Sequence, residues 1–392
     1  MKISENTLEN RSAAGVICEL NPPHAGHSAL FRRIRAASDA PVVCVMSGNF
    51  VQRGEPAVFP KLPRAECAVL LGADLVIELP VSASLSSAEG FAEAGAALLA
   101  SLGVNRIAFG CESGELPPLT LAAEALNSEA AETATRRALA YGKSYAAARG
   151  YALREVLGGA ADVLREPNNT LAVEYIRAVG RLGADIAPLA FPREPGYSSE
   201  RVRSLLLAGD RGAWDVVPPD CAELLRPVPP VFPGDLETAL LSRLRALSPD
   251  GFSEISGGSD GLAERAAKAV SSAATLGELL ALTKTRRHAM SRVKRYMLAA
   301  ALGLRAETLP PQYIRPLALS ERGGALLKRA RLPVISRTAD VRSLPEDARR
   351  AFALEAAATD FYTLGYAAPE LRRAGSELRL SPKFIGTATE SR

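Results

Sequence analysis

The sequence is poor in histidine and in paired cysteines. Only three of its 392 residues are His, and its five cysteines, Cys18, Cys44, Cys67, Cys111 and Cys221, include no CxxC pair. Neither a disulfide framework nor a zinc site is therefore indicated, and we expect no bound metal within the protein. We expect the cysteines to be small buried residues.

Long apolar runs are also missing. The longest stretches, such as VVCVM and LVIEL, are far too short to cross a bilayer. The first residues, MKISENTLENRSAAG, lack the basic and then apolar layout of a secretory signal peptide. We therefore expect a cytoplasmic protein that does not contact membranes.

Apolar strands alternate with helical stretches in the first half of the chain. The expected strands are GVICEL, VVCVMS, DLVIELP, RIAFG and DIAPLAF, and the expected helices cover roughly residues 27–37, 62–72, 88–102, 119–141 and 170–182. This alternation predicts an α/β fold with a mostly parallel sheet that is covered on both faces.

Proline and glycine interrupt this pattern beyond Trp214, in PVPPVFPGD and SPDGFSEISGGSDG, and the chain that follows is predicted to be mainly helical. The length is also more typical of two or three domains than of one. We expect an α/β domain at residues 1–212 and a mainly helical region at residues 213–392.

Two of the three histidines, His24 and His27, lie in NPPHAGH, directly after the first expected strand. In a doubly wound sheet, ligands bind where strand ends meet the following helices, and free N–H groups at a helix start favour phosphate. Two imidazoles three residues apart can share a face, and Gly26 lets a ligand approach the backbone. The alternative is a chance HxGH pattern, but its position favours nucleotide chemistry, with both rings stabilising a five-coordinate phosphorus.

HxGH at this position resembles the signature of the HIGH-type nucleotidylyltransferases. Further stretches resemble the bacterial tRNA(Met) cytidine acetate ligase family: ELNPPHAGHSALF, MSGNFVQRGEPAVFPKLPRAECAVLLGADLVIELP, SSAEGFAEAGAALLASLGV, AFGCESGE, REPNNTLAVEYI, PREPGYSS, SRVKRYMLAAALGL and PQYIRPLALSERGGALLKR. The similarity runs from about Ala14 to Leu364. It implies a Rossmann-like HIGH-type nucleotidylyltransferase domain that binds ATP, followed by a mainly helical, tRNA-binding region.

The resemblance also implies a reaction. Such enzymes condense acetate with ATP to acetyl-adenylate, releasing pyrophosphate, and transfer the acetyl group to N4 of the wobble cytidine of elongator tRNA(Met), releasing AMP. The cytosine amino group is a poor nucleophile, so it needs an acyl group with a good leaving group. ATP, acetate and tRNA are thus the expected partners, Mg²⁺ could accompany ATP, and no stable protein partner is implied.

By motif, the resemblance places ATP on a continuous segment and on a few later positions. The segment is Ile17, Cys18, Glu19, Leu20, Asn21, Pro22, Pro23, His24, Ala25, Gly26, His27, Ser28, Ala29 and Leu30, and the later positions are Gly110, Asn168 or Asn169, Arg193 and Arg203. An amide can read a base or ribose, and a guanidinium can hold phosphate oxygens. For the two asparagines the alternative role is an N-cap of the next helix.

His24 and His27 are the expected catalytic pair, and Lys61 and Arg64, at an expected helix start, could present two cations to the departing pyrophosphate. For this second pair a solvated helix face is an equal alternative. Ser47, Asn49 and Gln52 could contact acetate or the target base. The sequence departs from the second phosphate motif of related enzymes, SSTxxR, because Glu200 follows Ser198 and Ser199, and because Tyr197 replaces the usual His.

Positive charge is concentrated between residues 281 and 337, which hold thirteen Lys or Arg and only two acids, so the rest of the chain is net negative. Such clustering is typical of phosphate-backbone binding, although a solvated surface is the alternative. The expected tRNA contacts are Lys284, Arg286, Arg287, Arg292, Lys294 and Arg295, with His288, Tyr296 and Tyr313 able to stack on bases. The competing functions are a small-molecule adenylyltransferase and a non-catalytic, nucleotide-dependent RNA-binding protein.

Overall fold

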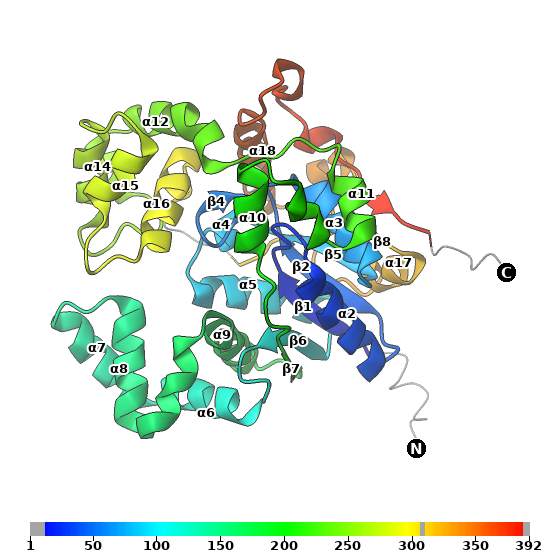
Figure 1. The fold of residues 1–392 in the computed structure, drawn as a ribbon, viewed down its shortest axis with the longest axis horizontal. Helices are drawn as coiled ribbons and strands as arrows, with labels where there is room; N and C mark the ends of the chain where they lie inside the picture. Colours follow the sequence, from blue (N-terminus) through cyan, green and yellow to red (C-terminus); the bar gives the residue numbers. More distant parts are fainter. Residues whose placement is uncertain (1–11, 306–309, 387–392) are drawn as a thin grey trace.

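The computed structural model describes residues 12–305 and 310–386, and its centre is a seven-stranded sheet (Figure 1). Five parallel strands, in the order β7-β6-β1-β2-β5, are β7 (Ala187–Pro192), β6 (Arg106–Cys111), β1 (Ala14–Cys18), β2 (Val42–Ser47) and β5 (Leu75–Leu79). All five expected strands are confirmed. The chain order is that of the Rossmann fold, with the switch point between β1 and β6.

Helices cover both faces of the sheet because alternate strand residues point to opposite sides. On one face Val16 and its neighbours pack with α2 (Ala25–Ala37) and α3 (Lys61–Leu70). On the other face Ile17 and its neighbours pack with α5 (Ala88–Ser101) and α9 (Pro167–Leu182). These four helices were expected, within a few residues.

The single helix expected at residues 119–141 is wrong. The structure has two helices there, α6 (Pro117–Leu126) and α7 (Glu129–Ala140). Ser128 separates them, since its hydroxyl accepts a hydrogen bond from the N–H of Ala131 and so starts a new helix. The next helix, α8 (Tyr145–Leu157), and a 3-10 segment, η1 (Gly158–Arg165), were not predicted.

Two strands from the second half of the chain extend the sheet. β8 (Pro316–Leu319) pairs antiparallel with β5, and β9 (Lys383–Phe384) pairs with β8. Runs of four and two residues are too short to show the alternation from which strands are recognised. The domain division at residue 212 stays a prediction, and any such division has to allow for a sheet built from both halves.

Beyond β7 the chain is mostly helical. Its helices are α10 (Ser199–Leu207), α11 (Pro219–Leu225), α12 (Glu237–Arg245), α13 (Pro249–Ser253), α14 (Leu262–Val270), α15 (Leu276–Thr283), α16 (Met290–Leu302), α17 (Glu321–Leu327) and α18 (Glu346–Thr363). Within residues 12–305 and 310–386, no helix has the length and apolar character needed to cross a membrane.

A small hairpin joins the sheet to the helices around α16. It comprises β3 (Phe50–Val51) and β4 (Glu55–Pro56) and follows β2, just before α3. Phe50 is buried in the apolar core formed by residues of α12, α14, α15, α16 and α18. Short helix α4 (Val81–Ser84), after β5, adds Val81 to the same core. The hairpin therefore fixes where α16 lies relative to the strand ends.

Gly54, at the turn of the hairpin, lies directly against α16. Its φ is +77°, and a Cβ there would come within 2.4 Å of the backbone nitrogen of Arg295. We expect Gly54→Ala to destabilise the protein by more than the ~1–2 kcal/mol that a left-handed backbone alone costs an alanine, because a helix backbone cannot move aside. Urea denaturation measures the difference in free energy of unfolding.

Gly103 supplies the matched control for this substitution. Its φ is +70°, and nothing lies within 4 Å of the position a Cβ would take. Gly103→Ala therefore has the same backbone strain without the contact, and we expect only about 1–2 kcal/mol of destabilisation. Equal losses for the two variants would show that the hairpin does not pack tightly on α16.

Candidate active site

The two histidines form the start of α2, at the carboxyl end of β1. His24 is the N-cap residue, and its Nδ1 accepts a hydrogen bond from the N–H of Gly26 at 3.1 Å. Nδ1 of His27 accepts from the N–H of His24 at 3.2 Å, and the two ring centroids are 3.9 Å apart. Since each Nδ1 accepts a hydrogen bond, a neutral ring carries its proton on Nε2. The turn thus holds two Nε2–H donors side by side.

Both rings are neutral at physiological pH. Burial, and then the charge of Arg193, lower the pKa of His24 to about 4. Burial, followed by His24 and Arg193, lowers the pKa of His27 well below its ordinary value. The rings therefore act as neutral hydrogen-bond donors and not as cations.

We expect an NMR titration of the ATP-free protein to show His24 staying neutral down to about pH 4. The unfolded chain takes up this proton near pH 6.5, so it binds more protons than the folded chain between the two values. The contribution of His24 to stability is therefore complete above about pH 6.5 and declines as the pH falls toward 4. The pKa of the same ring in the urea-unfolded protein is the control. A pKa near 6.5 for His24 in the native protein would contradict the buried geometry of the ring.

Three contacts fix the backbone before the histidines. Oδ1 of Asn21 accepts from the N–H of Val58 at 2.8 Å. Arg203 donates to the carbonyl of Asn21 at 2.8 Å, and the hydroxyl of Ser199 donates to the carbonyl of Pro22 at 3.1 Å. The motif SSExxR at the start of α10 thus lies beside the HxGH turn, and Glu200 is exposed at this end of the helix.

The rest of the segment from residue 17 to residue 30 supports this turn. Ile17 and Leu20 are buried, as are Pro22, Pro23 and Ala29, whereas Cys18, Ala25, Gly26, Ser28 and Leu30 are half-buried. A Cβ on Gly26 would lie 2.9 Å from Cε1 of His24, so a side chain there would push the imidazole out of place. The segment therefore forms one compact unit around the histidine pair.

A second polar cluster lies at the end of β6, across the switch point. Glu112 accepts from Nδ2 of Asn168 at 2.5 Å, from the N–H of Asn169 at 2.9 Å and from Arg193 at 3.1 Å. Burial raises the pKa of Glu112, but the hydrogen bonds from Asn168 and Arg193 outweigh it and lower the pKa below its usual value. A Cβ on Gly110 would lie 3.3 Å from Cγ of Arg193. The structure thus brings all four predicted residues together around a carboxylate.

The two asparagines have different surroundings. Oδ1 of Asn169 accepts from the N–H groups of Glu112 and Ser113, and the residue is buried. Asn168 is half-buried. The N-cap of α9 is Glu166, so the capping role considered for the pair is wrong. Sequence analysis missed Glu112, although an acid two residues after Gly110 in AFGCESGE was a usable signal.

Glu19 connects the histidine turn with the β3–β4 hairpin. Its Oε1 accepts from the N–H of Gln52 at 2.6 Å and from the hydroxyl of Ser47 at 3.4 Å. Burial raises the pKa of Glu19 above its usual value, against the opposing effects of the Gln52 N–H and of Arg64. The carboxylate therefore binds the hairpin backbone at the end of the first strand.

The alternative that Lys61 and Arg64 form a solvated helix face is wrong, and their role at the departing pyrophosphate stays a prediction. Lys61 is buried between Glu78 and Glu377, with each pair at 2.6 Å. Arg64 is fully buried and donates to backbone carbonyls, among them that of Glu19 at 2.5 Å. Both side chains are held by internal partners, and they organise the strand ends beneath the site.

Asn49 is also part of this interior. Its Nδ2 donates to Thr359 at 3.2 Å, and its Oδ1 accepts from the N–H of Lys61 at 3.0 Å. Ser47 is fully buried, and Gln52 is half-buried. The side chains of Ser47 and Asn49 therefore hold the loop in place, and Gln52 is held through its backbone N–H and carbonyl.

The basic segment is more heterogeneous than the sequence suggests. Lys294 pairs with Glu55 at 2.5 Å, Arg295 donates to the carbonyl of Gln52 at 3.0 Å, and Arg292 pairs with Asp260 at 3.0 Å. Lys284 donates to the carbonyl of the next residue at 2.5 Å. Lys294 and Arg295 thus attach α16 to the β3–β4 hairpin.

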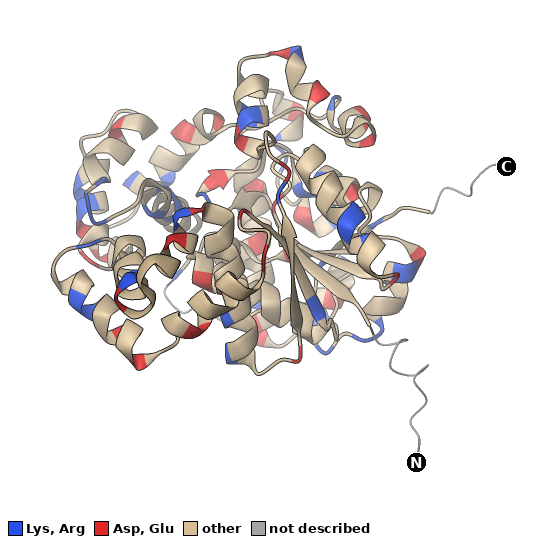
Figure 2. Ribbon diagram, turned by 60° about the horizontal axis from the view of Figure 1, so that its bottom comes forward, with Lys and Arg blue, Asp and Glu red and all other residues tan. Residues whose placement is uncertain are grey.

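Arg286 and Arg287 are the exposed members of this set, whereas the other four are half-buried. Figure 2 shows acidic segments scattered among basic ones over most of the ribbon, with several basic segments at its left edge. His288, Tyr296 and Tyr313 are buried, so the expectation that these rings stack on bases is wrong. Tyr296 instead donates a hydrogen bond to the carbonyl of Phe252 at 2.6 Å.

Within the described part of the chain, no group of three or more His, Cys, Asp or Glu is placed to hold a metal ion. The five cysteines are unpaired thiols, and four of them are buried.

Comparison with known proteins identifies the family. A family model described as HIGH Nucleotidyl Transferase matches residues 11–377. The tRNA(Met) cytidine acetate ligase of Syntrophomonas wolfei is 35% identical over 94% of this chain and 98% of its own length. The tRNA(Met) cytidine acetate ligase of Caldanaerobacter subterraneus is 35% identical over 90% of this chain and 95% of its own length.

Solved structures agree with the sequence comparison. Thermotoga maritima TmcAL bound with alpha-thio ATP superimposes with a TM-score of 0.88 at 29% identity, over 96% of this chain and 100% of that chain. The resemblance read from the motifs is confirmed. The chain belongs to the HIGH nucleotidyl transferase family and, within it, groups with the tRNA(Met) cytidine acetate ligases.

Proposed function

We propose that this chain is a cytoplasmic, ATP-dependent ligase that acetylates N4 of the wobble cytidine of elongator tRNA(Met). The observation that carries the proposal is the pair of Nε2–H donors at the start of α2, next to the switch point of a Rossmann sheet. Ligands of such sheets bind at this edge, where helix N-termini favour phosphate. The names of the relatives supply the substrates.

ATP lies with its phosphates over the HxGH turn in this proposal. The donors of His24 and His27 face the α-phosphate, and Arg203, held beside the turn by the carbonyl of Asn21, faces the β- and γ-phosphates. The cluster around Glu112 lies across the switch point from the turn and contacts the nucleoside. Asn168, which is half-buried, is the amide that makes this contact. Mg²⁺ arrives bound to the triphosphate, as is usual for this ion.

The first step forms acetyl-adenylate. A carboxylate oxygen of acetate attacks the α-phosphorus, the bond from that phosphorus to the bridging oxygen breaks, and pyrophosphate leaves. Negative charge grows on the oxygens of the α-phosphate as the fifth ligand approaches. Neutral imidazole donors held in advance by backbone hydrogen bonds stabilise this charge without reorganising.

The second step transfers the acetyl group. N4 of the cytidine attacks the acetyl carbon, the bond between that carbon and the adenylate oxygen breaks, AMP leaves, and the amine loses a proton. The target base has to leave its stack to reach the adenylate. Of the predicted phosphate-binding residues, Arg286 and Arg287 are best placed to hold the tRNA backbone because they are the most exposed.

One assay tests the proposal. The protein is incubated with ATP, labelled acetate and unmodified tRNA(Met), and the digested tRNA is examined for labelled N4-acetylcytidine, with AMP and pyrophosphate measured in parallel. We expect label in that nucleoside only when all three substrates are present. AMP found in a small-molecule product regardless of tRNA would identify an adenylyltransferase instead. Binding without turnover would identify a non-catalytic RNA-binding protein.

A further inference from the structure

The connection between β6 and β7 is much longer than the fold requires. A crossover between parallel strands needs about a dozen residues, usually one helix. Helix α9 meets that need, since its apolar residues Ala172, Val173 and Tyr175 pack into the core on the sheet. Helices α7 and α8 form an additional hairpin, the α7–α8 hairpin (residues 129–157), with a small core of Ala131, Ala134 and Ala152. This hairpin is not explained by the architecture of the sheet.

The β6–β7 connection, which contains the hairpin, begins and ends at the proposed ATP site. The chain leaves that site after Glu112 at the end of β6 and returns to it at Asn168, at the start of α9. Anything that binds the hairpin is therefore attached to a connection whose two ends are joined by several hydrogen bonds at the site.

Exposed tyrosines lie at the turn of this hairpin and along α8. Tyr141 is 83% exposed, and Tyr145 and Tyr151 are 41% and 42% exposed. The ammonium group of Lys143 lies 5.6 Å from the centre of the Tyr151 ring. Aromatic rings with cations beside them are the groups on which unpaired nucleotides stack.

The tip also meets the basic segment from the other half of the chain. A Cβ on Gly142 would lie 3.2 Å from a guanidinium nitrogen of Arg287, so the turn between α7 and α8 touches that side chain. Figure 1 shows the α7–α8 hairpin and the helices α14, α15 and α16 on the same side of the molecule. Exposed aromatic rings and the exposed arginines of residues 284–295 are therefore parts of one surface.

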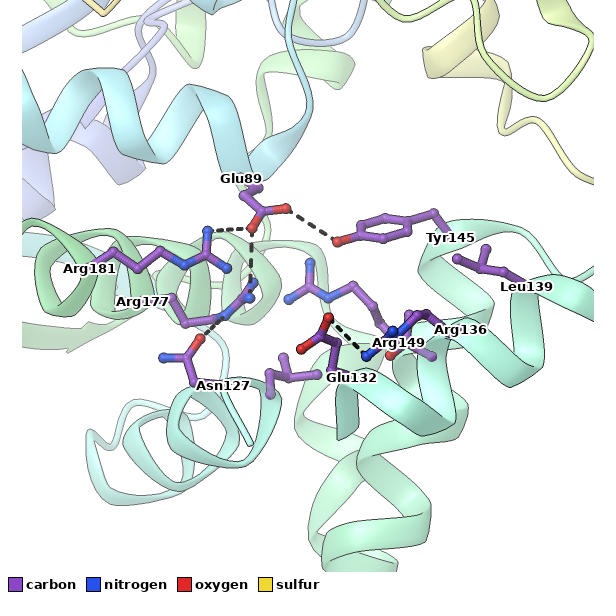
Figure 3. A pocket seen from close by; sticks show the side chains of 11 residues that line it. Glu89, Asn127, Glu132, Arg136, Leu139, Tyr145, Arg149, Arg177 and Arg181 are labelled. Atoms are coloured by element: carbon purple, nitrogen blue, oxygen red, sulfur yellow. Dashed lines mark hydrogen bonds and ion pairs between the residues drawn. The ribbon is translucent and has the colours of Figure 1, made fainter. Parts of the chain in front are cut away.

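A cavity of about 560 Å³ opens beneath the tip (Figure 3). Four arginines and two glutamates line it, together with Tyr145 and other residues of α7, α8 and α9; the charged ones are Arg136, Arg149, Arg177, Arg181, Glu89 and Glu132. The hydroxyl of Tyr145 donates to Glu89 at 3.2 Å. The cavity has the size of a small-ligand site, and each of its arginines is ion-paired with a glutamate: Arg136 with Glu132, Arg149 and Arg177 with Glu174, and Arg181 with Glu89 and Glu93.

We propose that the α7–α8 hairpin is a second tRNA-docking surface, on which unpaired nucleotides stack against Tyr141 while Lys143 and Arg287 hold backbone phosphates. This inference rests on the proposed function, because it takes the RNA to be the tRNA substrate. RNA is favoured over a protein partner because exposed rings and cations lie together on this surface, and unpaired nucleotides stack on such rings while the cations bind their phosphates.

The test measures the affinity of labelled, unmodified tRNA(Met) for variants of the full chain. We expect Tyr141→Ala to weaken binding by about tenfold, the usual effect of removing one stacking ring, and Tyr141→Phe to bind like the wild type. Lys143→Glu combined with Arg287→Glu should weaken binding further and lower the slope of log affinity against log salt by about two, one for each lost phosphate contact. Because Tyr141 is 83% exposed, its truncation leaves the core intact.

Matched controls remove the same kind of group from elsewhere. Arg32→Glu makes the same charge reversal at one exposed position of α2, half the change of the Lys143/Arg287 pair, and Leu364→Ala shortens an apolar side chain that is 44% exposed. Both should bind tRNA like the wild type, and ATP affinity should be unchanged in every variant. Binding within twofold of wild type for Tyr141→Ala and for the charge-reversed pair would overturn the proposal.

Two further outcomes separate this inference from the proposed function. If the wild type acetylates tRNA and the hairpin variants bind it normally, only the docking surface is wrong. If the wild type binds tRNA through the hairpin but transfers no acetyl group, only the proposed function is wrong. If the hairpin variants change the oligomeric state of the protein in solution but bind tRNA with unchanged affinity, the tip is an interface between copies. That result would also overturn the proposal.

Discussion

Replacing His24 with asparagine is expected to slow acetyl transfer by about 10²–10³-fold, the usual effect of removing one donor from a developing oxyanion. The imidazole has two separate roles, since Nδ1 caps α2 by accepting from Gly26 and Nε2–H is left for the phosphate. Asparagine is among the best N-cap residues, so it keeps the first role and loses the second. Steady-state acetylation measures the loss, and thermal unfolding measures the cap.

Comparison with alanine makes this test sharper. His24→Ala loses the cap as well as the donor, so it should show a similar loss of acetyl transfer and an additional destabilisation of about 1 kcal/mol. Both variants should bind tRNA almost normally, because the ring is buried in the turn. A His24→Asn protein that keeps more than a tenth of the wild-type rate would show that the imidazole does not stabilise the transition state.

The part of the site that sequence reasoning could predict is local. The position of His24 and His27 follows from one strand and one turn, because a strand end and the next helix start are neighbours in sequence. The five parallel strands are similarly local, since each is a short apolar run bounded by turns. The proximity of Arg203 to Asn21 required a motif known from related enzymes, as 182 positions separate the two residues.

What the sequence could not predict depends on distant charge pairs. Lys61 and Arg64 have the three-residue spacing of a solvated cationic face, and only the packing of Glu78 and Glu377 shows that Lys61 is inside. Lys294 has the same ambiguity, because its partner Glu55 is 239 positions away. In the sequence, a run of basic residues looks the same whether or not carboxylates pack against it in the folded protein. The exposed tyrosines of the α7–α8 hairpin were missed because α8, which contains Tyr145 and Tyr151, was not predicted.

Lys61→Met is expected to destabilise the protein by about 3–5 kcal/mol, the usual cost of removing one partner from a buried ion pair. Glu78 and Glu377 are both almost fully buried and would share the single cation Arg315, which donates to Glu377 at 3.2 Å. Methionine has a similar length, so little of the loss comes from an unfilled cavity. Urea denaturation gives the free energy of unfolding of each protein.

The loss should depend on pH in a definite direction. Burial raises the pKa of Glu78 even in the native protein, where Lys61 opposes the increase. Without Lys61 the pKa of Glu78 rises further, so the folded variant holds a proton that the unfolded chain releases. The stability of the variant is then retained when the pH lies below the ordinary pKa of Glu, and it declines as the pH rises above that value. Lys61→Met should therefore cost more at pH 8 than at pH 5.5.

The double variant Lys61→Met/Glu78→Gln separates charge from packing. It removes the cation together with one of its carboxylates, so we expect it to be more stable than Lys61→Met and to lose most of the pH dependence. The ion-pair network would be contradicted if Lys61→Met lowered the free energy of unfolding by less than 1 kcal/mol, or by the same amount at both pH values. Acetyl transfer by the double variant then tests the role expected for Lys61 from sequence. Recovery of both stability and transfer would show that Lys61 supports only the fold and does not act on the pyrophosphate.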